Sequence, residues 1–531
     1  MPRISRSRYG GMWPSQTTEA QDTVYAQLAI DVDLSSGTLR PMRAAKRISQ
    51  ATGHALLVDG CHVFADAGYV SYAHNPVGCN IVYRAGVAGH VEFAEVSSDP
   101  QWRRLSLPPP AAAPTATPVA AFVDDTTAED VQYVYTYVAG SREGPPSYPS
   151  SPFLSNFGAA RVLTNFVWPD AGYGVAQINV YQAVTGTKAL DRDTPVAAAY
   201  RFVGSVFPGE DTLTHDGQFL GALLETQMYA EAPADLVSLD FIEAHAVLCG
   251  ISPLRKMVAF SEPYQPHAFP IENYLRFGDT PRRVLGNRTT TFVLTDGYPY
   301  LMPTAPGRAA RTPVPIEQAL PIIAPRSAAV FAHGVVYAST DGLVMITNSG
   351  RATVITNAWL NQQQWRAILP TAMVGAIYDG YYYGGTPEQA FRFRLNDDAF
   401  QLKADDQLIY LSMRPTAMYA SRRDGLYYAD ATGTYRWGEG NTVLPFKWVS
   451  TNLRSNGVMA FNAARVHRSD HGELVITHIH DNRLVLRREV GYSLPYRVGM
   501  KASARTHAVQ LEGTAEVYAD VIATSMRELD R

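Results

Sequence analysis

The sequence predicts an all-β protein. Gly (40 residues) and Pro (35 residues) are spread along the 531-residue chain, and Tyr is abundant, with 30 residues. Scattered Gly and Pro separate short strands and turns, and Tyr suits half-buried pleated surfaces. Helical periodicity is sparse, and its best candidates are the short segments 315–320 and 357–369.

Asp-Gly pairs recur beside aromatic or β-branched runs. They begin at Asp59, Asp296, Asp341, Asp379 and Asp424, and the last four are 45, 38 and 45 residues apart. Asp-Gly favours tight hairpins, because type I′ turns need positive φ at both central residues. A period of about 40–45 residues with hairpins is typical of a four-stranded propeller blade. The alternative is that these are ordinary hairpins without a common repeat.

The first of these pairs lies far upstream of the others. A strand or blade from the other end of the chain can close a propeller and remove its exposed edges. We therefore expect residues 1–106 to contribute one or more blades to a β-propeller body whose remaining blades come from residues 236–440.

Residues 107–235 interrupt this pattern. The segment opens with a stiff Pro/Ala-rich linker, 107–114, and its next strand carries Tyr133, Tyr135 and Tyr137 on one face. It resembles a fibronectin III-like β-sandwich. Residues 121–235 contain 14 acidic and 5 basic residues. The sequence thus predicts an acidic inserted β-sandwich, called the inserted module below.

Residues 441–531 form the last predicted domain. Two alternating strands flank Asp481-Asn482, and two more are predicted near the end of the chain. We expect a small C-terminal β-domain.

The most distinctive stretch is the string FSEPYQPHAFP at residues 260–270, followed by LTDGYPY from Leu294. Three prolines within eight positions exclude a helix or a central strand, so we expect an ordered, aromatic-rich loop that leaves a strand. With the strings WLNQQQW, ATSMREL and GTLRPMR, it resembles the tail nozzle (tail tubular) proteins of short-tailed bacteriophages, which are podophage virion proteins. The residues of the signature loop that carry this resemblance are Ser261, Glu262, Pro263, Tyr264, Pro266, His267 and Pro270.

The resemblance implies a structural protein rather than an enzyme. It implies a homohexameric ring below the portal and adaptor, with a central channel for ejection of double-stranded DNA without sequence specificity. Expected partners are further copies of the chain, tail adaptor or portal-proximal proteins, and tail fibres or spikes. The expected location is the virion tail, after assembly in the host cytoplasm. No active-site residue and no cofactor is carried over.

Composition agrees with that expectation. The net charge of −4 does not indicate tight general binding of DNA. The three cysteines, Cys61, Cys79 and Cys249, are too few for a disulfide framework and indicate reduced thiols. The N-terminal MPRISRSRYGG has no apolar core typical of a secretory signal, and no run of about 18 apolar residues predicts a transmembrane helix.

Two groups of residues are candidates for binding. His478 and His480 are two apart in a predicted strand, so both imidazoles share one face and form a weak candidate metal site beside the simpler interpretation of unrelated histidines. Four arginines are candidates for contacts with DNA phosphates in a channel or with a neighbouring subunit, or lie in solvated loops. They are Arg282, Arg283, Arg308 and Arg311.

Two other functions stay open. A receptor- or glycan-binding tail protein would present Trp side chains as stacking platforms, and the candidates are Trp359, Trp365 and Trp437, although core packing also explains them. A polysaccharide-degrading tail enzyme would need paired carboxylates about 5–10 Å apart. The candidate pairs for that chemistry are Asp124/Asp125 and Asp405/Asp406.

Overall fold

The structure is a computed structural model of the chain. It describes residues 3–14, 24–60, 62–66, 68, 70–75, 80–87, 89–97, 99–123, 128–156, 158–187, 199–217, 221–242, 245–303, 312–395, 408–421, 424–499 and 503–529. The predicted all-β class is confirmed, because the described residues form many small sheets and one six-residue α-helix, α1 (Gln362–Ala367). None of the helices described is long and apolar enough to cross a membrane.

The chain divides into two compact units. Unit 1 contains Met1–Tyr69, Leu294–Leu301 and Val314–Arg531, and unit 2 contains Val70–Val293 and Met302–Pro313. Each unit is therefore assembled from separate stretches of sequence.

Unit 1 contains several sheets. A ten-stranded sheet runs in the order β32 (Val374–Tyr378), β33 (Tyr381–Gly385), β34 (Ala390–Arg394), β35 (Ile409–Leu411), β2 (Ala26–Ile30), β39 (Phe446–Ser450), β45 (Ser503–Gly513), β42 (Leu474–His480), β43 (Arg483–Glu489), with β40 (Leu453–Ala460) also on β45. Three four-stranded sheets follow the orders β1 (Arg3–Arg6), β46 (Val517–Ala523), β41 (Ala463–Arg468), β44 (Tyr496–Arg497); β28 (Ala329–Phe331), β29 (Gly334–Ser339), β30 (Gly342–Thr347), β31 (Ala352–Val354); and β36 (Ala417–Ser421), β37 (Gly425–Ala429), β38 (Thr434–Arg436), β5 (Lys46–Ser49). Two hairpins pair β3 (Val32–Asp33) with β4 (Arg40–Pro41) and β6 (Ala55–Asp59) with β7 (His62–Asp66).

Unit 2 also consists of small sheets. Two four-stranded sheets follow the orders β11 (Arg103–Arg104), β10 (His90–Glu95), β9 (Ile81–Val87), β8 (Ser71–His74) and β20 (Val237–Ile242), β21 (Val247–Ser252), β22 (Met257–Phe260), β23 (Tyr274–Arg276). The inserted module adds the sheet β12 (Thr115–Pro118), β16 (Arg161–Thr164), β19 (Leu213–His215) and the sheet β14 (Arg142–Glu143), β13 (Ala128–Ala139), β17 (Gln177–Thr187), β18 (Arg201–Val206), with β15 (Phe153–Asn156) on β13. The boundary between the units falls within β25, which follows β24 and precedes β26 and β27; these strands are β24 (Pro281–Gly286), β25 (Thr290–Thr295), β26 (Tyr300–Pro303) and β27 (Val314–Pro315).

Short helical turns connect these strands. The 3₁₀ turns are η1 (Ala171–Tyr173), η2 (Thr226–Met228), η4 (Ile271–Asn273), η6 (Pro325–Ser327), η7 (Ile355–Ala358), η8 (Pro370–Ala372) and η9 (Met526–Glu528). The helix predicted over 357–369 is thus confirmed in part, because α1 begins after Asn361, whose side chain forms a capping box with Gln364. The helix predicted over 315–320 is wrong: Pro315 ends β27, and no helix follows it there.

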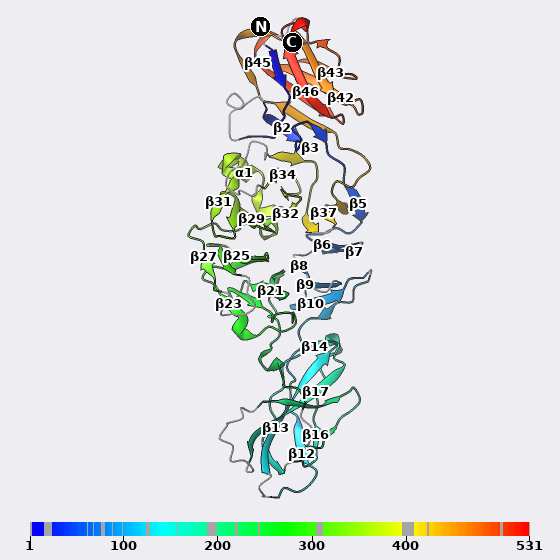
Figure 1. The fold of residues 1–531 in the computed structure, drawn as a ribbon, viewed down its shortest axis with the longest axis vertical. Coiled ribbons are helices and arrows are strands. Elements are labelled where there is room, and N and C mark those ends of the chain that lie inside the picture. Colours follow the sequence, from blue (N-terminus) through cyan, green and yellow to red (C-terminus); the bar gives the residue numbers. More distant parts are fainter. Residues whose placement is uncertain are drawn as a thin grey trace. The chain divides into compact units, whose positions relative to one another are not determined.

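Strands from the N-terminal region complete sheets built from distant sequence within unit 1. β5 pairs antiparallel with β38, so it forms one edge of the sheet that begins at β36. β1 pairs with β46, which places the two ends of the chain side by side (Figure 1). β2 lies between β35 and β39. These pairings bury apolar side chains that are far apart in sequence in one core.

The predicted hairpins are present, and one has the predicted turn type. Asp379 and Gly380 have φ of 49° and 74° and connect β32 to β33 through the pair Tyr378–Tyr381. Positive φ at both central positions is the type I′ geometry. The Asp481-Asn482 turn between β42 and β43 has φ of 48° and 61°. At Asp341 the Asp-Gly pair does not occupy both central positions of the turn. Gly342 pairs with Ser339 across the hairpin, so it already belongs to the strand.

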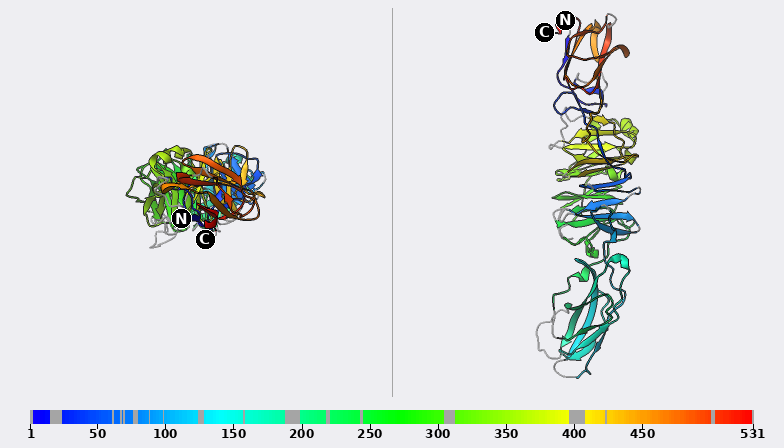
Figure 2. Two further views of the ribbon diagram at one scale, coloured as in Figure 1. Left: turned by 90° about the horizontal axis from the view of Figure 1, so that it is seen from above. Right: turned by 90° about the vertical axis from the view of Figure 1, so that its right-hand side faces the viewer.

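The inserted module has its own core between two sheets. The faces of β13, β17 and β18 share one hydrophobic cluster with β12, β16 and β19, and Tyr133, Tyr135 and Tyr137 are all buried in it. Two sheets thus contribute to one core, and Figure 2 shows the strands of the module (cyan to green) running along one another. The ends of the module meet, because the Ala232 N–H donates to Ser106 Oγ at 2.9 Å.

Candidate functional site

The signature loop follows β22, the third strand of the sheet β20-β21-β22-β23 in unit 2. β22 ends at Phe260, residues 261–270 follow without regular structure, and η4 then leads into β23. Phe260 and Phe269 are fully buried. The expectation of an ordered, aromatic-rich loop leaving a strand is therefore confirmed.

Hydrogen bonds hold the first half of the loop against the sheet. Buried Ser261 accepts the Leu248 N–H on its Oγ at 2.9 Å, and its hydroxyl donates to the Glu262 carbonyl at 3.0 Å. The Glu262 N–H donates to the Ala268 carbonyl at 2.9 Å, which closes the loop on itself. The Asn273 amide donates to Glu262 Oε1 at 2.8 Å. These contacts give Ser261 and Glu262 a structural role.

His267 joins the loop to the inserted module. Its ring is buried, and Nε2 lies 3.2 Å from the Glu143 carbonyl in β14. Burial lowers the pKa of His267 to about 4, because the charged form would lose its hydration, and nearby Arg142 also disfavours it. The ring is therefore neutral near pH 7, and Nε2–H is the donor to the carbonyl.

Arg142 anchors the same junction from the module side. Its guanidinium donates to the Arg104 carbonyl at 2.9 Å and to the Leu105 carbonyl at 2.6 Å. It also lies 4.5 Å from the centre of the Phe93 ring, a cation–π contact. Burial lowers its pKa to about 10, which still leaves it charged at neutral pH. His267 in the signature loop and Arg142 in β14 together attach the inserted module to the rest of unit 2.

Glu143 completes the junction with its side chain. Its carboxylate accepts hydrogen bonds from Thr136 at 2.5 Å and from Tyr181 at 2.6 Å. The phenol of Tyr181 has a raised pKa, because burial and the neighbouring carboxylate both disfavour the phenolate. Tyr181 is therefore a fixed donor in this network.

Tyr264 differs from the rest of the loop. Its side chain is 60% exposed, and its backbone has φ of 58°, a conformation that non-glycine residues seldom adopt. Its N–H donates to the His245 carbonyl at 3.1 Å, which helps to hold this conformation. The loop thus presents one aromatic ring to solvent while its other aromatic residues are buried.

The candidate metal pair lies in the core of unit 1. His478 and His480 are both buried in β42, with ring centres 6.4 Å apart. His478 Nε2 lies 2.9 Å from the Tyr496 hydroxyl, and the His480 ring stands edge-on to His507 at 4.6 Å. Among the residues that the structure describes, no group of three or more His, Cys, Asp or Glu is arranged to hold a metal ion. The contacts give these rings packing roles.

The pKa values of two of these rings reflect their burial. The pKa of His478 is lowered to about 3 and that of His507 to about 4, mainly by burial and in smaller part by the positive charge of a protonated His480. Neutral rings suit the apolar cluster that surrounds them.

The candidate arginines separate into different environments. Arg282 is exposed on β24, whereas the guanidinium of neighbouring Arg283 donates to Ser238 Oγ at 3.2 Å. Burial lowers the pKa of Arg283, and Asp240 opposes that shift. Arg308 and Arg311 lie outside the described residues. Arg282 thus remains the described candidate with an exposed side chain.

The tryptophans proposed for glycan stacking belong mainly to the core. Trp359 and Trp365 are buried, and Trp365 Nε1 donates to the Ser339 carbonyl at 3.0 Å. Trp437 is half-buried and packs edge-on against Tyr428.

Cys249 is buried too, with its thiol directed at the Asp240 carbonyl. The carboxylate pairs Asp124/Asp125 and Asp405/Asp406, and also Cys61 and Cys79, lie outside the described residues.

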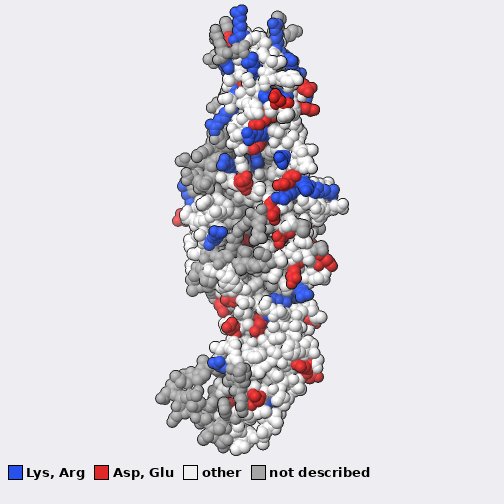
Figure 3. Space-filling view, turned by 45° about the vertical axis from the view of Figure 1, so that its right-hand side comes forward, with Lys and Arg blue, Asp and Glu red and all other residues white. Residues whose placement is uncertain are grey.

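The surface charge is uneven. In Figure 3 a few acidic and basic side chains lie on the largely uncharged visible surface of the inserted module, whereas basic and acidic side chains are more frequent and intermingle on the C-terminal sheets. The ion pairs Arg40–Glu516 and Lys447–Glu512 belong to that C-terminal region, with N–O distances of 2.6 and 3.0 Å.

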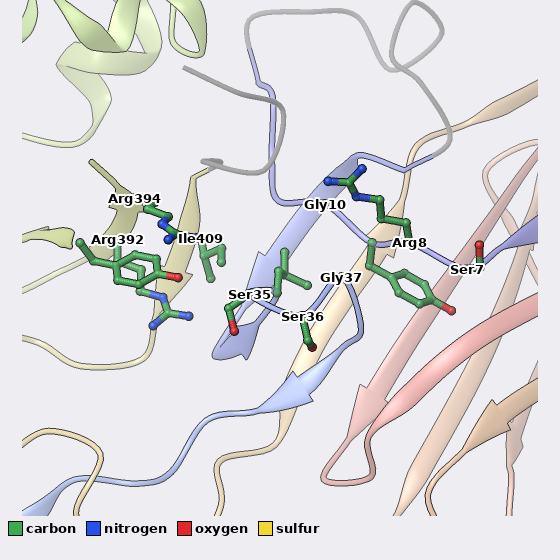
Figure 4. Close-up of a pocket in the computed structure, with 12 residues that line it drawn as sticks. Ser7, Arg8, Gly10, Ser35, Ser36, Gly37, Arg392, Arg394 and Ile409 are labelled. Atoms are coloured by element: carbon green, nitrogen blue, oxygen red, sulfur yellow. The ribbon is translucent and has the colours of Figure 1, made fainter. Parts of the chain in front are cut away.

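A polar cavity in unit 1 escaped the sequence analysis. Its volume is about 490 Å³ (Figure 4), and it is lined by Ser7, Arg8, Tyr9, Gly10, Leu34, Ser35, Ser36, Gly37, Tyr381, Arg392, Arg394 and Ile409. The alternating string FRFR at 391–394 does place Arg392 and Arg394 on one face of a strand. Nothing in the sequence indicates that this face meets Arg8, because only the fold brings the two segments together.

Comparison with known proteins does not assign a family. No family model and no curated protein matches the chain. Among solved structures, Hsv2 of Kluyveromyces lactis is 11% identical over 41% of this chain and 72% of its own, with a TM-score of 0.26. The WD40 domain of Neurospora crassa Pan2 is 10% identical over 62% of this chain and 95% of its own, with a TM-score of 0.29. TM-scores this low do not establish a shared fold.

Proposed function

We propose that this chain is a structural subunit of the tail of a short-tailed bacteriophage. Copies of it close into a ring, the nozzle, through which double-stranded DNA leaves the particle. The observation that carries the proposal is the string FSEPYQPHAFP with its companion strings, on which the resemblance rests. The proposed role of the chain is mechanical. Its proposed partners are further copies of the chain, the tail adaptor or portal-proximal proteins, and the tail fibres or spikes.

The contacts of the signature loop support a building role. The polar side chains of Ser261, Glu262 and His267 bind neighbouring backbone and side-chain atoms of the same unit. Catalytic residues instead direct their reactive atoms towards a substrate. A loop whose polar groups form hydrogen bonds within the same unit suits a subunit with a structural role.

The body of the subunit is, in this proposal, a β-propeller. Support comes from the repeated four-stranded antiparallel sheets and from β5, which completes the sheet of β36, β37 and β38 with a strand from the other end of the chain. In this sheet β5 covers the edge that β38 would otherwise expose. Propeller closure would make each subunit a stiff element of the tube wall.

Ring formation requires a head-to-tail interface that closes after a fixed number of copies. The resemblance indicates six. Such an assembly guides DNA without gripping it, so the DNA contact has no sequence specificity. Electron microscopy of the purified full-length protein is the direct test, and the expected result is a sixfold ring with an axial channel. A trimeric spike would contradict the proposal.

A charge-reversal pair sharpens the test. Arg282 and Arg276 are both exposed on strands of unit 2. If Arg282 lies at a subunit interface or in the channel, Arg282→Glu lowers the fraction of rings or slows DNA release from assembled particles. Arg276→Glu is the control for the change of charge alone. A depolymerase assay on host surface polysaccharide should show no activity, and degradation would favour the enzyme alternative.

A further inference from the structure

The signature loop displays one side chain that its own subunit does not use. Tyr264 is 60% exposed, and its φ of 58° is costly for a residue with a bulky side chain. Among the described residues its ring contacts no other ring and its hydroxyl forms no hydrogen bond. A strained backbone that presents an aromatic ring to solvent points to a contact outside the chain.

Two further exposed apolar side chains belong to the same region of unit 2. Met228 is 63% exposed and Ile271 is 70% exposed. The Phe269 N–H donates to the Ala230 carbonyl at 3.0 Å, which joins the two segments that carry these side chains. The side-chain hydrogen bond from η4 to the signature loop also holds Ile271 against the loop that carries Tyr264.

Carboxylates surround these apolar side chains. The segments 225–231 and 261–273 contain no lysine or arginine, and their four acidic residues are Glu225, Glu231, Glu262 and Glu272. The pKa of Tyr229 is raised mainly by burial, and the charges of Glu262 and Glu225 add to the rise. Both carboxylates therefore lie close together at this surface.

Most of this negative charge has no counter-charge. Glu225, Glu262 and Glu272 form no ion pair with the residues that the structure describes. Glu231 is left out of this count, because burial raises its pKa and Arg104 opposes that rise. The neighbouring strand β14 adds one arginine and one glutamate, whose charges offset each other. We call the region around Tyr264 the acidic surface.

A second surface, in unit 1, has the opposite charge. Residues 40–48 contain four basic residues and no acidic residue. One of the four, Arg40, is paired with a carboxylate. The other three, Arg43, Lys46 and Arg47, are exposed and form no ion pair within the described part of the chain.

Apolar side chains accompany these cations as well. β5 is the last strand of its sheet, so its outer edge faces solvent. Ile48 on this strand is 37% exposed, and Val443, which pairs with Arg43 in an isolated bridge, is 43% exposed. We call this region the basic surface.

Two carboxylates lie in the segments beside the basic surface. Glu439 is paired with Arg436 at 3.6 Å, whereas Asp430 accepts hydrogen bonds from the Thr432 hydroxyl at 2.6 Å and from the Gly433 N–H at 3.1 Å. One carboxylate without a cationic partner thus remains beside three cations, and the excess charge is positive.

We propose that these two surfaces meet between copies of the chain, so that the acidic surface of one copy docks on the basic surface of the next. A cation of the basic surface stacks on the exposed ring of Tyr264, and the glutamates pair with the other cations. Because the two surfaces differ, the contact is head-to-tail and can continue around a ring. The inference rests on the proposed function and deepens it by naming the surfaces that join neighbouring subunits.

Sedimentation of the full-length protein over a range of concentrations, followed by electron microscopy, tests this contact. Tyr264→Asn removes the ring, and because Asn tolerates a positive φ the variant should fold. The concentration at half-assembly should rise about tenfold or more. Lys46→Glu should have an effect of similar size on the other surface. The controls Leu254→Ser, at a residue that is 88% exposed, and Arg483→Glu, at another exposed position, should leave assembly unchanged.

A mixture of the two variants tests the head-to-tail arrangement. Each variant keeps one intact surface, so Tyr264→Asn and Lys46→Glu together should form dimers with one copy of each and no larger assembly. Normal assembly of either variant, or an equal loss in the controls, would overturn the inference and leave the proposed function standing. Open filaments of the parent protein that both substitutions abolish would support the contact and contradict the ring. A parent protein that stays monomeric at every concentration would overturn both.

Discussion

A buried ion pair connects the two ends of the chain. Arg6 in β1 and Asp520 in β46 are 2.6 Å apart, with side chains 1% and 2% exposed. The Tyr9 hydroxyl donates to the other carboxylate oxygen at 2.9 Å, and burial beside that carboxylate raises the pKa of Tyr9 well above its ordinary value. Trp448 packs against both Arg6 and Tyr9. Asp520 therefore organises a polar group inside an apolar core.

Replacement of this carboxylate should destabilise unit 1. Asp520→Asn leaves the guanidinium of Arg6 buried without its counter-charge, and loss of one partner of such a pair costs about 3–5 kcal/mol. We expect a clear fall in the thermal midpoint by scanning calorimetry. Arg40→Ala removes an ion pair whose arginine side chain is 49% exposed, and its cost should stay below about 1 kcal/mol. Equal effects of the two variants would show that burial does not set the strength of these pairs.

The neutral histidines make stability depend on pH. His478 and His507 have folded-state pKa values of about 3 and about 4, below the value of about 6.5 expected after unfolding. The unfolded chain therefore binds protons first as the pH falls below 6.5. The free energy of unfolding should decrease by about 1.4 kcal/mol per pH unit for each ring until its folded pKa is reached.

Denaturant unfolding between pH 7.5 and 4.5 measures this slope. His507→Gln should make the decrease below pH 6.5 shallower, and above pH 7 its curve should run parallel to that of the parent protein. An unchanged slope in the variant would mean that His507 is protonated in the folded protein over this range.

At the scale of single elements, turn chemistry fixes where strands reverse. The Asp379-Gly380 turn meets the demand of a type I′ hairpin for positive φ at two successive residues. Such a turn sets the register of β32 against β33, which keeps the apolar residues of both strands on the buried face. The turn at Asp379-Gly380 therefore depends on two adjacent residues and needs no contact with distant sequence.

Gly380→Ala tests this instruction. Gly380 has φ of 74°, and a Cβ there would meet nothing within 4 Å, so the cost of the change comes from the backbone conformation alone. We expect a loss of about 1–2 kcal/mol in calorimetric stability. Gly278 also has open space around it but no such backbone conformation, so Gly278→Ala should change stability by less than about 0.5 kcal/mol. A neutral Gly380→Ala would argue against the type I′ turn.

At the scale of the whole molecule, the inserted module and the N-terminal strands behave differently. The module has its own core, and its ends meet at Ser106 and Ala232. β5 has no core of its own and serves as one strand of a sheet from distant sequence. The module is therefore a candidate for removal, and β5 is not.

Excision of residues 107–231 with a short Gly-Ser linker should leave the rest of the protein folded. The excised segment should also fold alone, because its buried residues contact one another. The loss of the His267 and Arg142 contacts should lower the stability of the remainder without abolishing its cooperative unfolding. Circular dichroism and calorimetry of both pieces measure this. Deletion of β5 is the contrasting variant, since it exposes the edge of β38 and should cause aggregation. If both pieces were unfolded after the excision, the inserted module and the rest of the chain would not fold independently, which would contradict this prediction.

Much of this organisation could be predicted from local patterns. The hairpin at Asp379, the alternating face of Tyr133, Tyr135 and Tyr137, and the irregular loop at 261–270 follow from turn preferences, strand periodicity and proline. The helix predicted over 315–320 failed because its first residue, Pro315, pairs in the edge strand β27 and Pro321 directly follows its last residue, which leaves too short a stretch for a helix. The propeller closure and the phage assignment stay predictions that await the tests above.

The sequence by itself determined the all-β class, the turns and the position of the signature loop, because these depend on residues a few positions apart. Only the tertiary structure decided that β1 pairs with β46, that His478 is buried beside Tyr496, and that Arg8 lines the same cavity as Arg392 and Arg394. Those relations join residues separated by hundreds of positions. Backbone pairing and burial bring them together, and no local pattern in the chain encodes them.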